Sequence, residues 1–401
     1  MNRNNERHFN QIPEMKASRT RFNRDQTILT TFDSGKLIPF YVDEVLPGDT
    51  FNINTSAIIR MTTPKYPVMD DAFIDFYYFY CPNRILWDNF KQFMGEVDET
   101  PWMPTKTYKV PEIIINSSTE GLPYEASILD YMGVPTKVKG SFSVNALPIR
   151  AYVKIWNEYF RDENVGNEAT IKTNDTDVLY EDSSSDNINL VLNVAYKGGR
   201  CLPVNKFHDY FTSCLPYAQR GPEVALPMQG NARISGYLNS KFDEKTPLYV
   251  NSFYDGSTNP GNIKSKLYSI AEDGTTGAAY LGIGDGTGED NHVVYLGADL
   301  SSVTAATIND LRKAVAVQQY YEALARGGSR YREQVQALWD VVISDKTVQI
   351  PEYLGGGRYH VNINQIVQTS GQQTNQDTPI GETGAISVTP INESSFTKSF
   401  E

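Results

Sequence analysis

The segment AFIDFYYFYC, residues 72–81, constrains the fold of this chain more than any other stretch. It is an almost continuous run of apolar and aromatic side chains. Aromatic residues favour strands, and a strand without polar alternation is covered on both faces. We expect the core to cover one face and something else, often a partner subunit, to cover the other. LIPFYVDEV, residues 37–45, predicts a second strand of this kind.

The segment TFNINTSAIIRM, residues 50–61, alternates apolar and polar side chains instead. A period of two predicts a half-buried strand with one face on the core and the other toward solvent. The expected buried face carries Phe51, Ile53, Ala57, Ile59 and Met61. The expected exposed face carries Asn52, Asn54, Ser56 and Arg60.

Between these runs, PFYVDEVLPGDTFNI (residues 39–53) brings three carboxylates together in sequence. Asp43, Glu44 and Asp49 could form an acid/base cluster, or one strand could simply turn into the next. The Pro-Gly pair suits the centre of a type II turn, and Asp49 can bond the turn backbone. Neighbours on a strand point to opposite faces, so Asp43 and Glu44 cannot address one substrate atom. The pattern favours a strand-turn-strand corner.

Helices are fewer, and three segments predict them. LPIRAYVKIWNEYFRDEN has apolar residues at the spacing of an amphipathic helix. TAATINDLRKAVAVQQYYEALARGG predicts a helix that begins near Thr304 or Thr307 and ends at Gly327-Gly328. SRYREQVQALWDV predicts a short third helix. The stripe of the first helix, which we assign to core or interface, is Ile149, Tyr152, Val153, Trp156, Tyr159 and Phe160.

The 401 residues exceed what one core usually holds, so we expect one large β-domain with long insertions, or two domains. Residues 25–230 read as the first part of the core, with a polar, acidic insertion at 163–188. Residues 231–300 form a Gly- and Tyr-rich surface insertion, and 301–401 a helical segment that returns to the core. Tyr with Gly suits a recognition loop, and a variable surface loop with no specific ligand is the alternative. The candidate host-facing side chains are Tyr254, Tyr268, Tyr280 and Tyr295.

The first 24 residues form a basic arm on an acidic chain. Six Arg or Lys side chains oppose two Glu, a net of +4, which leaves −16 on the remainder of a chain with net charge −12. A protein that wraps nucleic acid by itself should be basic, so the acidic body argues against that role. A short basic arm is compatible with limited contact to phosphates from one end of the chain. A solvated terminus is the alternative. The candidate nucleic-acid contacts are Arg3, Arg7, Lys16, Arg19, Arg21 and Arg24.

Motifs for catalysis, metal binding and membrane insertion are missing from the sequence. GxSxG, HExxH and Walker A motifs do not occur, and four histidines stand far apart. Cys201, His208 and Cys214 are too loosely spaced for a tetrahedral metal site, and no cofactor is expected. No apolar run reaches the length of a membrane span or resembles a secretion signal. The odd count of three cysteines then favours synthesis in a reducing cytoplasm rather than a disulfide framework.

Eight blocks of the sequence carry a family resemblance. They are DEVLPGDTF, RMTTPKYPVMDD, CPNRILWDNFKQFMGE, LPIRAYVKIWNEYFRDEN, LPYAQRGPEVALP, RGGSRYREQV, PEYLGGG and FTKSFE. In this order they resemble the major capsid protein of microviruses, small single-stranded DNA phages, and most closely the gokushovirus branch. The resemblance covers nearly the whole chain outside 163–188 and 231–300. The family continues past FTKSFE, so we expect this chain to be truncated at its C-terminus.

The resemblance implies an eight-stranded antiparallel jelly roll that assembles with copies of itself into a T=1 icosahedral shell. It implies that 231–300 forms a three-fold protrusion that meets a host cell-surface receptor. The partners it implies are a circular single-stranded DNA genome, a small basic DNA-packaging protein and other virion proteins. The protein would be made in the bacterial cytoplasm and reside in the virion. The side chains expected to serve subunit or core contact are Tyr77, Phe79, Trp87, Tyr152, Trp156 and Phe160.

An enzyme remains the alternative hypothesis. A β-sandwich protein that binds or cleaves glycans would need two carboxylates facing one groove. Glu96, Asp98 and Glu99 are the candidates, although a polar turn explains them more simply.

Overall fold

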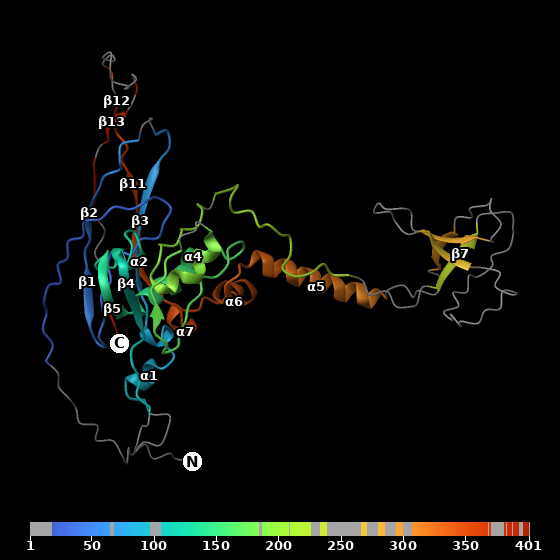
Figure 1. Cartoon of the computed structure of the whole chain (residues 1–401), viewed down its shortest axis with the longest axis horizontal. Coiled ribbons are helices and arrows are strands. Elements are labelled where there is room, and N and C mark those ends of the chain that lie inside the picture. The colour runs from blue at the N-terminus through green and yellow to red at the C-terminus, as the bar shows by residue number, and fades with distance from the viewer. Residues whose placement is uncertain are drawn as a thin grey trace. The chain divides into compact units, whose positions relative to one another are not determined.

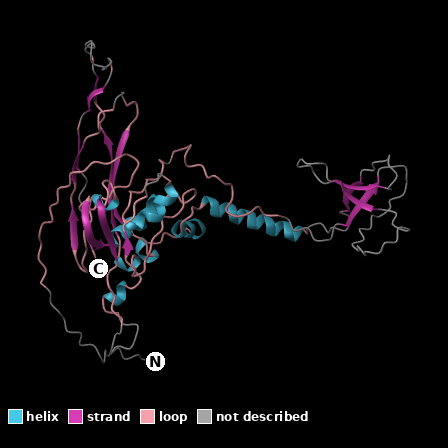
Figure 2. Cartoon of the chain, viewed as in Figure 1, coloured by secondary structure: helices cyan, strands magenta, loops and turns pink. Residues whose placement is uncertain are grey.

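The structure is a computed structural model, and Figures 1 and 2 show its elements. It describes residues 18–64, 68–96, 106–183, 187–207, 209–225, 307–367, 369, 381, 383–386, 388–392 and 396–400, and the backbone of four strands between 233 and 299. The chain forms two compact units. Unit 1 comprises Met1–Pro216 and Val341–Glu401, and unit 2 comprises Tyr217–Asp340.

The alternating segment 50–61 forms two short strands, β1 (Thr50–Ile53) and β2 (Ser56–Ile59). The five side chains predicted to be buried are half-buried and the four predicted to be exposed are exposed, so the predicted faces are confirmed, with the apolar Ile58 on the exposed face. The prediction of one continuous strand is wrong, because the two halves pair with different C-terminal strands. β1 pairs antiparallel with β15 (Phe396–Ser399), and β2 with β14 (Thr389–Asn392).

The prediction of a strand over residues 37–45 is also wrong. Among the described residues, its neighbourhood forms only an isolated bridge between Lys36 and Pro203, with the Leu37 N–H donating to Leu202 at 2.8 Å. Asp43 accepts a hydrogen bond from the backbone N–H of Glu44 at 2.9 Å. Such a local bond competes with ladder pairing, and it accounts for the irregular path of this part of the segment.

The aromatic segment forms β3 (Ala72–Tyr80), which pairs antiparallel with β11 (Glu352–Val361), the red strand beside it in Figure 1. Aromatic side chains cover both faces of β3 in part, although Phe73 is 53% exposed and Tyr77 38% exposed. On one face, the Tyr78 ring lies 5.9 Å from Phe40 and 5.1 Å from Phe396. On the other face, the Phe79 ring lies 4.8 Å from Tyr159. The chain's own helical segment therefore covers the second face at Phe79, where a partner subunit was expected.

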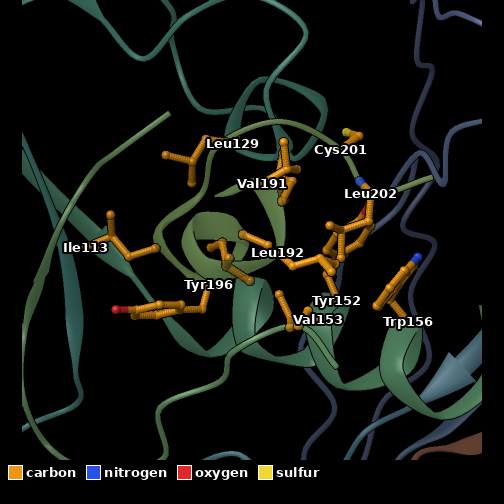
Figure 3. Close-up of a cluster of buried hydrophobic side chains, with 14 of the residues drawn as sticks. Ile113, Leu129, Tyr152, Val153, Trp156, Val191, Leu192, Tyr196, Cys201 and Leu202 are labelled. Carbon is orange, nitrogen blue, oxygen red and sulfur yellow. Dashed lines mark hydrogen bonds between the residues drawn. The ribbon is translucent and has the colours of Figure 1, made fainter. Parts of the chain in front are cut away.

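The core of unit 1 lies between a three-stranded sheet and three helices. The sheet has the order β5 (Val138–Asn145), β4 (Glu112–Leu122), β6 (Val178–Leu179). The helices are α2 (Ile128–Tyr131), α3 (Leu147–Ile155) and α4 (Ile188–Val194). Figure 3 shows side chains from both layers meeting, among them Ile113, Leu129, Val153 and Leu192.

The predicted amphipathic helix is confirmed as α3, which continues as a π-helical turn, η2 (Trp156–Phe160). The polar segment 163–188 packs against this turn. The Asn157 amide donates to the Ala169 carbonyl and accepts from the Ala169 N–H, both at 2.9 Å. Ala169 and Val178 are buried in the core, so parts of this segment are integral to unit 1.

Unit 2 contains the predicted helices α5 (Ile308–Arg326) and α6 (Tyr331–Trp339). Thr307 caps α5 by a capping box with Asp310, and Gly327 ends it, which confirms the second of the two predicted starts. The unit also holds two antiparallel pairs, whose strands are β7 (Arg233–Leu238) with β10 (Val294–Asp299) and β8 (Lys266–Ile270) with β9 (Tyr280–Gly284).

The remaining described elements are short. They are η1 (Asn83–Ile85), α1 (Phe90–Phe93), η3 (Ala195–Lys197), α7 (Asp345–Val348) and the pair β12 (Gln365–Val367) with β13 (Thr383–Ile386). Within the described residues, the strands form several small sheets of two or three strands. A single eight-stranded jelly roll is not evident in this pairing and stays a prediction.

Candidate interaction surfaces

The described end of the basic arm is anchored on the corner at residues 46–49. Arg19 donates to the carbonyl oxygens of Gly48 and, at 3.2 Å, of Pro47, and its guanidinium lies 3.8 Å from the Asp49 carboxylate. The corner is a closed turn, because the Asp49 N–H donates to the Leu46 carbonyl at 3.1 Å. Asp49 also accepts from the Leu46 N–H at 3.2 Å, as the sequence predicted.

Arg24 forms the second anchor of the arm. Its guanidinium donates to the Asp43 carboxylate at 2.6 Å and lies 5.8 Å from the centre of the Phe51 ring. The Tyr41 hydroxyl donates to the same carboxylate at 2.7 Å. Burial alone would raise the pKa of Asp43, but hydrogen bonds from Tyr41, Arg24 and the Glu44 N–H lower it overall. The carboxylate is therefore held ionised, as a docking point for the arm.

These contacts give Asp43 and Asp49 a structural role. Each is engaged by an arginine of the arm and by neighbouring backbone N–H groups. Burial and the bond to Asp43 raise the pKa of Tyr41 to about 12, so the hydroxyl stays a donor at neutral pH. The sequence alone did not indicate that the arm's arginines pair with these carboxylates, because the partners lie 19 to 30 residues apart.

The other candidate nucleic-acid and host contacts are less defined. Arg21 is exposed. Arg3, Arg7 and Lys16 lie outside the described residues, as does Tyr254. Three more tyrosines lie on described strands whose side chains are not described, namely Tyr268 on β8, Tyr280 on β9 and Tyr295 on β10. Both roles stay predictions.

The six candidates for subunit or core contact differ in exposure. Trp87, Tyr152, Trp156 and Phe160 are buried within unit 1, and Phe79 is half-buried. Tyr152 donates to the Leu37 carbonyl at 2.8 Å, and Trp156 donates to the Pro203 carbonyl at 2.6 Å. Only Tyr77, which is 38% exposed, presents a large part of its surface to solvent among the six.

One buried polar group was missed by sequence reasoning. Arg150 on α3 is 1% exposed and donates to the carbonyls of Leu86 at 3.2 Å and Asn174 at 2.9 Å. Burial lowers the pKa of Arg150, and the nearby charges of Asp88 and Asp175 oppose this shift. Asp175 in turn accepts hydrogen bonds from Trp87 and, at 2.6 Å, from Asn89. The network joins three distant segments, and the polar sequence around Asn174 was its only signal.

The described residues offer no catalytic or metal arrangement. No group of three His, Cys, Asp or Glu side chains among them could hold a metal ion. Burial raises the pKa of Cys81 and of Cys201 to about 12, which makes both thiols poor nucleophiles. Glu96 is exposed, while Asp98, Glu99 and His208 lie outside the described residues. In the described part of the chain, no helix has the length and apolar character needed to cross a bilayer.

Comparison with known proteins settles the family. Residues 10–401 match the family described as "Capsid protein (F protein)". The chain belongs to this phage capsid protein family. The capsid protein is 36% identical over 433 residues to capsid protein VP1 of Chlamydia phage 1, which covers 98% of this chain and 70% of that protein.

Two further capsid proteins are similar over most of this chain. Identity to capsid protein VP1 of Bdellovibrio phage phiMH2K is 36% over 400 residues, covering 99% of this chain and 69% of that protein. Identity to capsid protein VP1 of Spiroplasma virus 4 is 32% over 368 residues, covering 90% of this chain and 63% of that protein.

Family membership decides the broad class of the protein. It is a structural component of the virion of microvirus-like, single-stranded DNA phages, and capsid proteins of this kind form a homo-oligomeric shell. The predicted resemblance is confirmed. The hypothesis of a glycan-cleaving enzyme is set aside, because the family is one of capsid proteins.

Proposed function

We propose that this capsid protein is the major shell subunit of its virion, and that its copies assemble into a small T=1 icosahedral shell around circular single-stranded DNA. The observation that carries the proposal is the family match over residues 10–401. Shell subunits need large obligate interfaces, of the order of 2,000–5,000 Å² and more apolar than transient ones. Closed symmetry then buries surfaces that a monomer leaves exposed.

We propose that unit 1 carries the jelly-roll body. Two features support this assignment. The sheet of β3 and β11 meets the Phe396 ring of the C-terminal strand β15 across one face, as two sheets of a sandwich do. Strands from the two ends of unit 1 also pair directly, with Ile53 opposite Phe396. Such long-range antiparallel pairing between the first and last strands is compatible with a jelly roll.

We assign residues 1–24 to contact with DNA phosphates. Their net charge of +4 supports sequence-independent contact that weakens as salt rises. The anchors at Arg19 and Arg24 would fix one end of the arm on the body, which leaves the exposed Arg21 and the cations before Arg19 as the principal phosphate contacts. A small basic packaging protein would supply further positive charge, because the body itself is acidic.

We assign residues 231–300 to host attachment. The support is their Gly- and Tyr-rich composition and their position as an insertion between the two parts of unit 1. Deleting the insertion should remove attachment to host cells and leave the shell intact. Loss of assembly together with attachment would show a structural role instead.

The test of the main proposal is sedimentation with negative-stain electron microscopy of the purified capsid protein. The chain is examined over a range of protein concentrations and salt concentrations, with and without circular single-stranded DNA. Uniform shells would support the proposal, and nuclease-protected DNA would support packaging. Well-folded monomers under every assembly condition would refute it.

A further inference from the structure

An aromatic turn on unit 1 is unusually exposed. We define it as Phe207 together with residues 209–214, between the core and the end of unit 1 at Pro216. Tyr210 is 89% exposed and Phe211 is 82% exposed. Their rings contact each other at 5.6 Å in an edge-to-face arrangement, and they form the tip of the turn. Two adjacent large aromatic residues in water are a marker of an interaction site.

The turn is ordered by its own hydrogen bonds. The Asp209 carboxylate accepts from the N–H groups of Phe211 at 2.9 Å and Thr212 at 2.7 Å. The Thr212 hydroxyl accepts from the Asp209 N–H at 3.0 Å and donates to the Phe207 carbonyl. The tip therefore presents its aromatic rings in a set geometry, which lowers the entropy cost of binding.

The base of the turn is fixed to the β3–β11 sheet. The Arg358 guanidinium on β11 lies 5.2 Å from the centre of the Phe207 ring, within the range of a cation–π contact. Arg358 itself is held by two hydrogen bonds of 2.7 Å to the Asp75 carboxylate on β3. The base thus contacts the β3–β11 sheet, while Tyr210 and Phe211 remain largely exposed.

We infer that this aromatic turn is an anchor that inserts into a second copy of the same chain. The inference rests on the proposed function, since a shell subunit must bury large apolar surfaces against its own copies. At 150–250 Å² for each aromatic residue, Tyr210 and Phe211 together offer about 300 Å² of surface. That is over a third of the ~800 Å² that one partner contributes to a standard interface. Few, rigid, central aromatic anchors are typical of binding hot spots.

Cys214 provides a direct probe of this surface. Its sulfur lies 3.8 Å from the Tyr210 carbonyl, and it is the exposed member of the three cysteines. Cys81 and Cys201 have pKa values raised to about 12 by burial. A maleimide at neutral pH should therefore label Cys214 in dissociated subunits and leave the other two thiols unreacted, as peptide mass mapping would show.

The experiment compares labelling of Cys214 in dissociated subunits and in assembled particles. The rate should fall by at least about tenfold on assembly, and the double substitution Tyr210→Ser/Phe211→Ser should lower the particle fraction by a similar factor, as for hot-spot truncations. Tyr331→Ser removes an exposed aromatic residue elsewhere and should leave assembly unchanged. Circular dichroism and an unchanged melting temperature of the double variant would show that the fold is retained.

Each other outcome refutes the inference in a distinguishable way. Particles in which Cys214 reacts as fast as in free subunits, or normal assembly of the double variant, would remove this contact and leave the proposed function standing. Protection of Cys214 in dissociated subunits would mean that the chain covers its own turn. A wild-type chain that stays monomeric at all concentrations would remove the proposed function and this contact together.

Discussion

Substituting Gly356 on β11 should disrupt the central strand pair of unit 1. Gly356 pairs with Tyr77 on β3, and a Cβ added to it would lie 1.9 Å from the Phe76 carbonyl oxygen and 3.0 Å from the Tyr353 hydroxyl. A backbone atom cannot rotate away, so β11 would have to separate from β3 by about 1 Å to reach even a 3.0 Å contact. Gly356→Ala therefore forces apart the pair that carries the aromatic residues of both faces.

Gly356→Ala adds a single methyl group, yet it should lower the free energy of unfolding substantially. Overpacking costs about 1–3 kcal/mol, and each ladder hydrogen bond lost costs about 1 kcal/mol more, so we expect about 3 kcal/mol. Gly355→Ala is the matched control on the same strand. Its Cβ would lie 3.7 Å from the Phe396 ring, which is an ordinary contact. The free energy of unfolding should therefore change by less than about 1 kcal/mol.

Urea unfolding of the dissociated subunit measures the difference. Trp87 and Trp156 are buried in unit 1, so a shift of tryptophan fluorescence reports unfolding of that unit. With a slope of about 3 kcal/mol per M, the midpoint of the Gly356→Ala variant should fall by about 1 M relative to Gly355→Ala. Equal midpoints for the two variants, or a greater loss for Gly355→Ala, would refute the reasoning.

Three further predictions follow from the contacts of unit 1. Arg150→Met leaves the buried Leu86 carbonyl and the Asn174 carbonyl without their donor and should lower the free energy of unfolding by about 2–3 kcal/mol in urea titrations, whereas Lys109→Met, at an exposed ion pair, should leave it almost unchanged. Because the folded-state pKa of Asp43 is lowered, arm docking is present above its ordinary pKa of 3.8 and is lost as the pH falls through the lowered value. Asp43→Asn should mimic this loss at neutral pH, and faster tryptic cleavage after Arg24 would show it; an unchanged rate would contradict the docking. Replacing Arg21, which is exposed, with Gln should lower the DNA content per particle more than Arg24→Gln does, and equal packaging in both variants would argue against phosphate contact by the arm.

Local sequence patterns predicted the individual elements well where burial follows the chain's own periodicity. The alternation at 50–61 was reproduced side chain by side chain, and α3, α5 and α6 appear where the apolar spacing placed them. The turn at 46–49 follows from Pro-Gly and Asp, whose preferences are local. In each case the determinant lies within a few residues of its effect.

The sequence was less informative where one long-range contact decides the outcome. Residues 37–45 have the composition of a buried strand, but Asp43 is engaged by Arg24, Tyr41 and its own neighbouring N–H rather than by a ladder. The polar segment 163–188 looked like an insertion, yet Ala169 is buried and the Asn174 carbonyl accepts from Arg150. A polar segment is expected to be exposed unless buried groups elsewhere in the fold bond to it. Here those groups, Asn157 and Arg150, come from another part of the chain, so the segment's own sequence does not reveal them.

The sequence by itself determined the strand and helix character of its segments, the acidic body with its basic arm, and, through blocks in a recognisable order, the capsid family. Only the tertiary structure decided which surfaces meet. It placed Tyr159 rather than a partner subunit over Phe79, opposed Gly356 to the β3 backbone, and left Tyr210 and Phe211 exposed. Side-chain type sets what a residue requires of its surroundings, whereas long-range strand pairing and packing determine which neighbour supplies it.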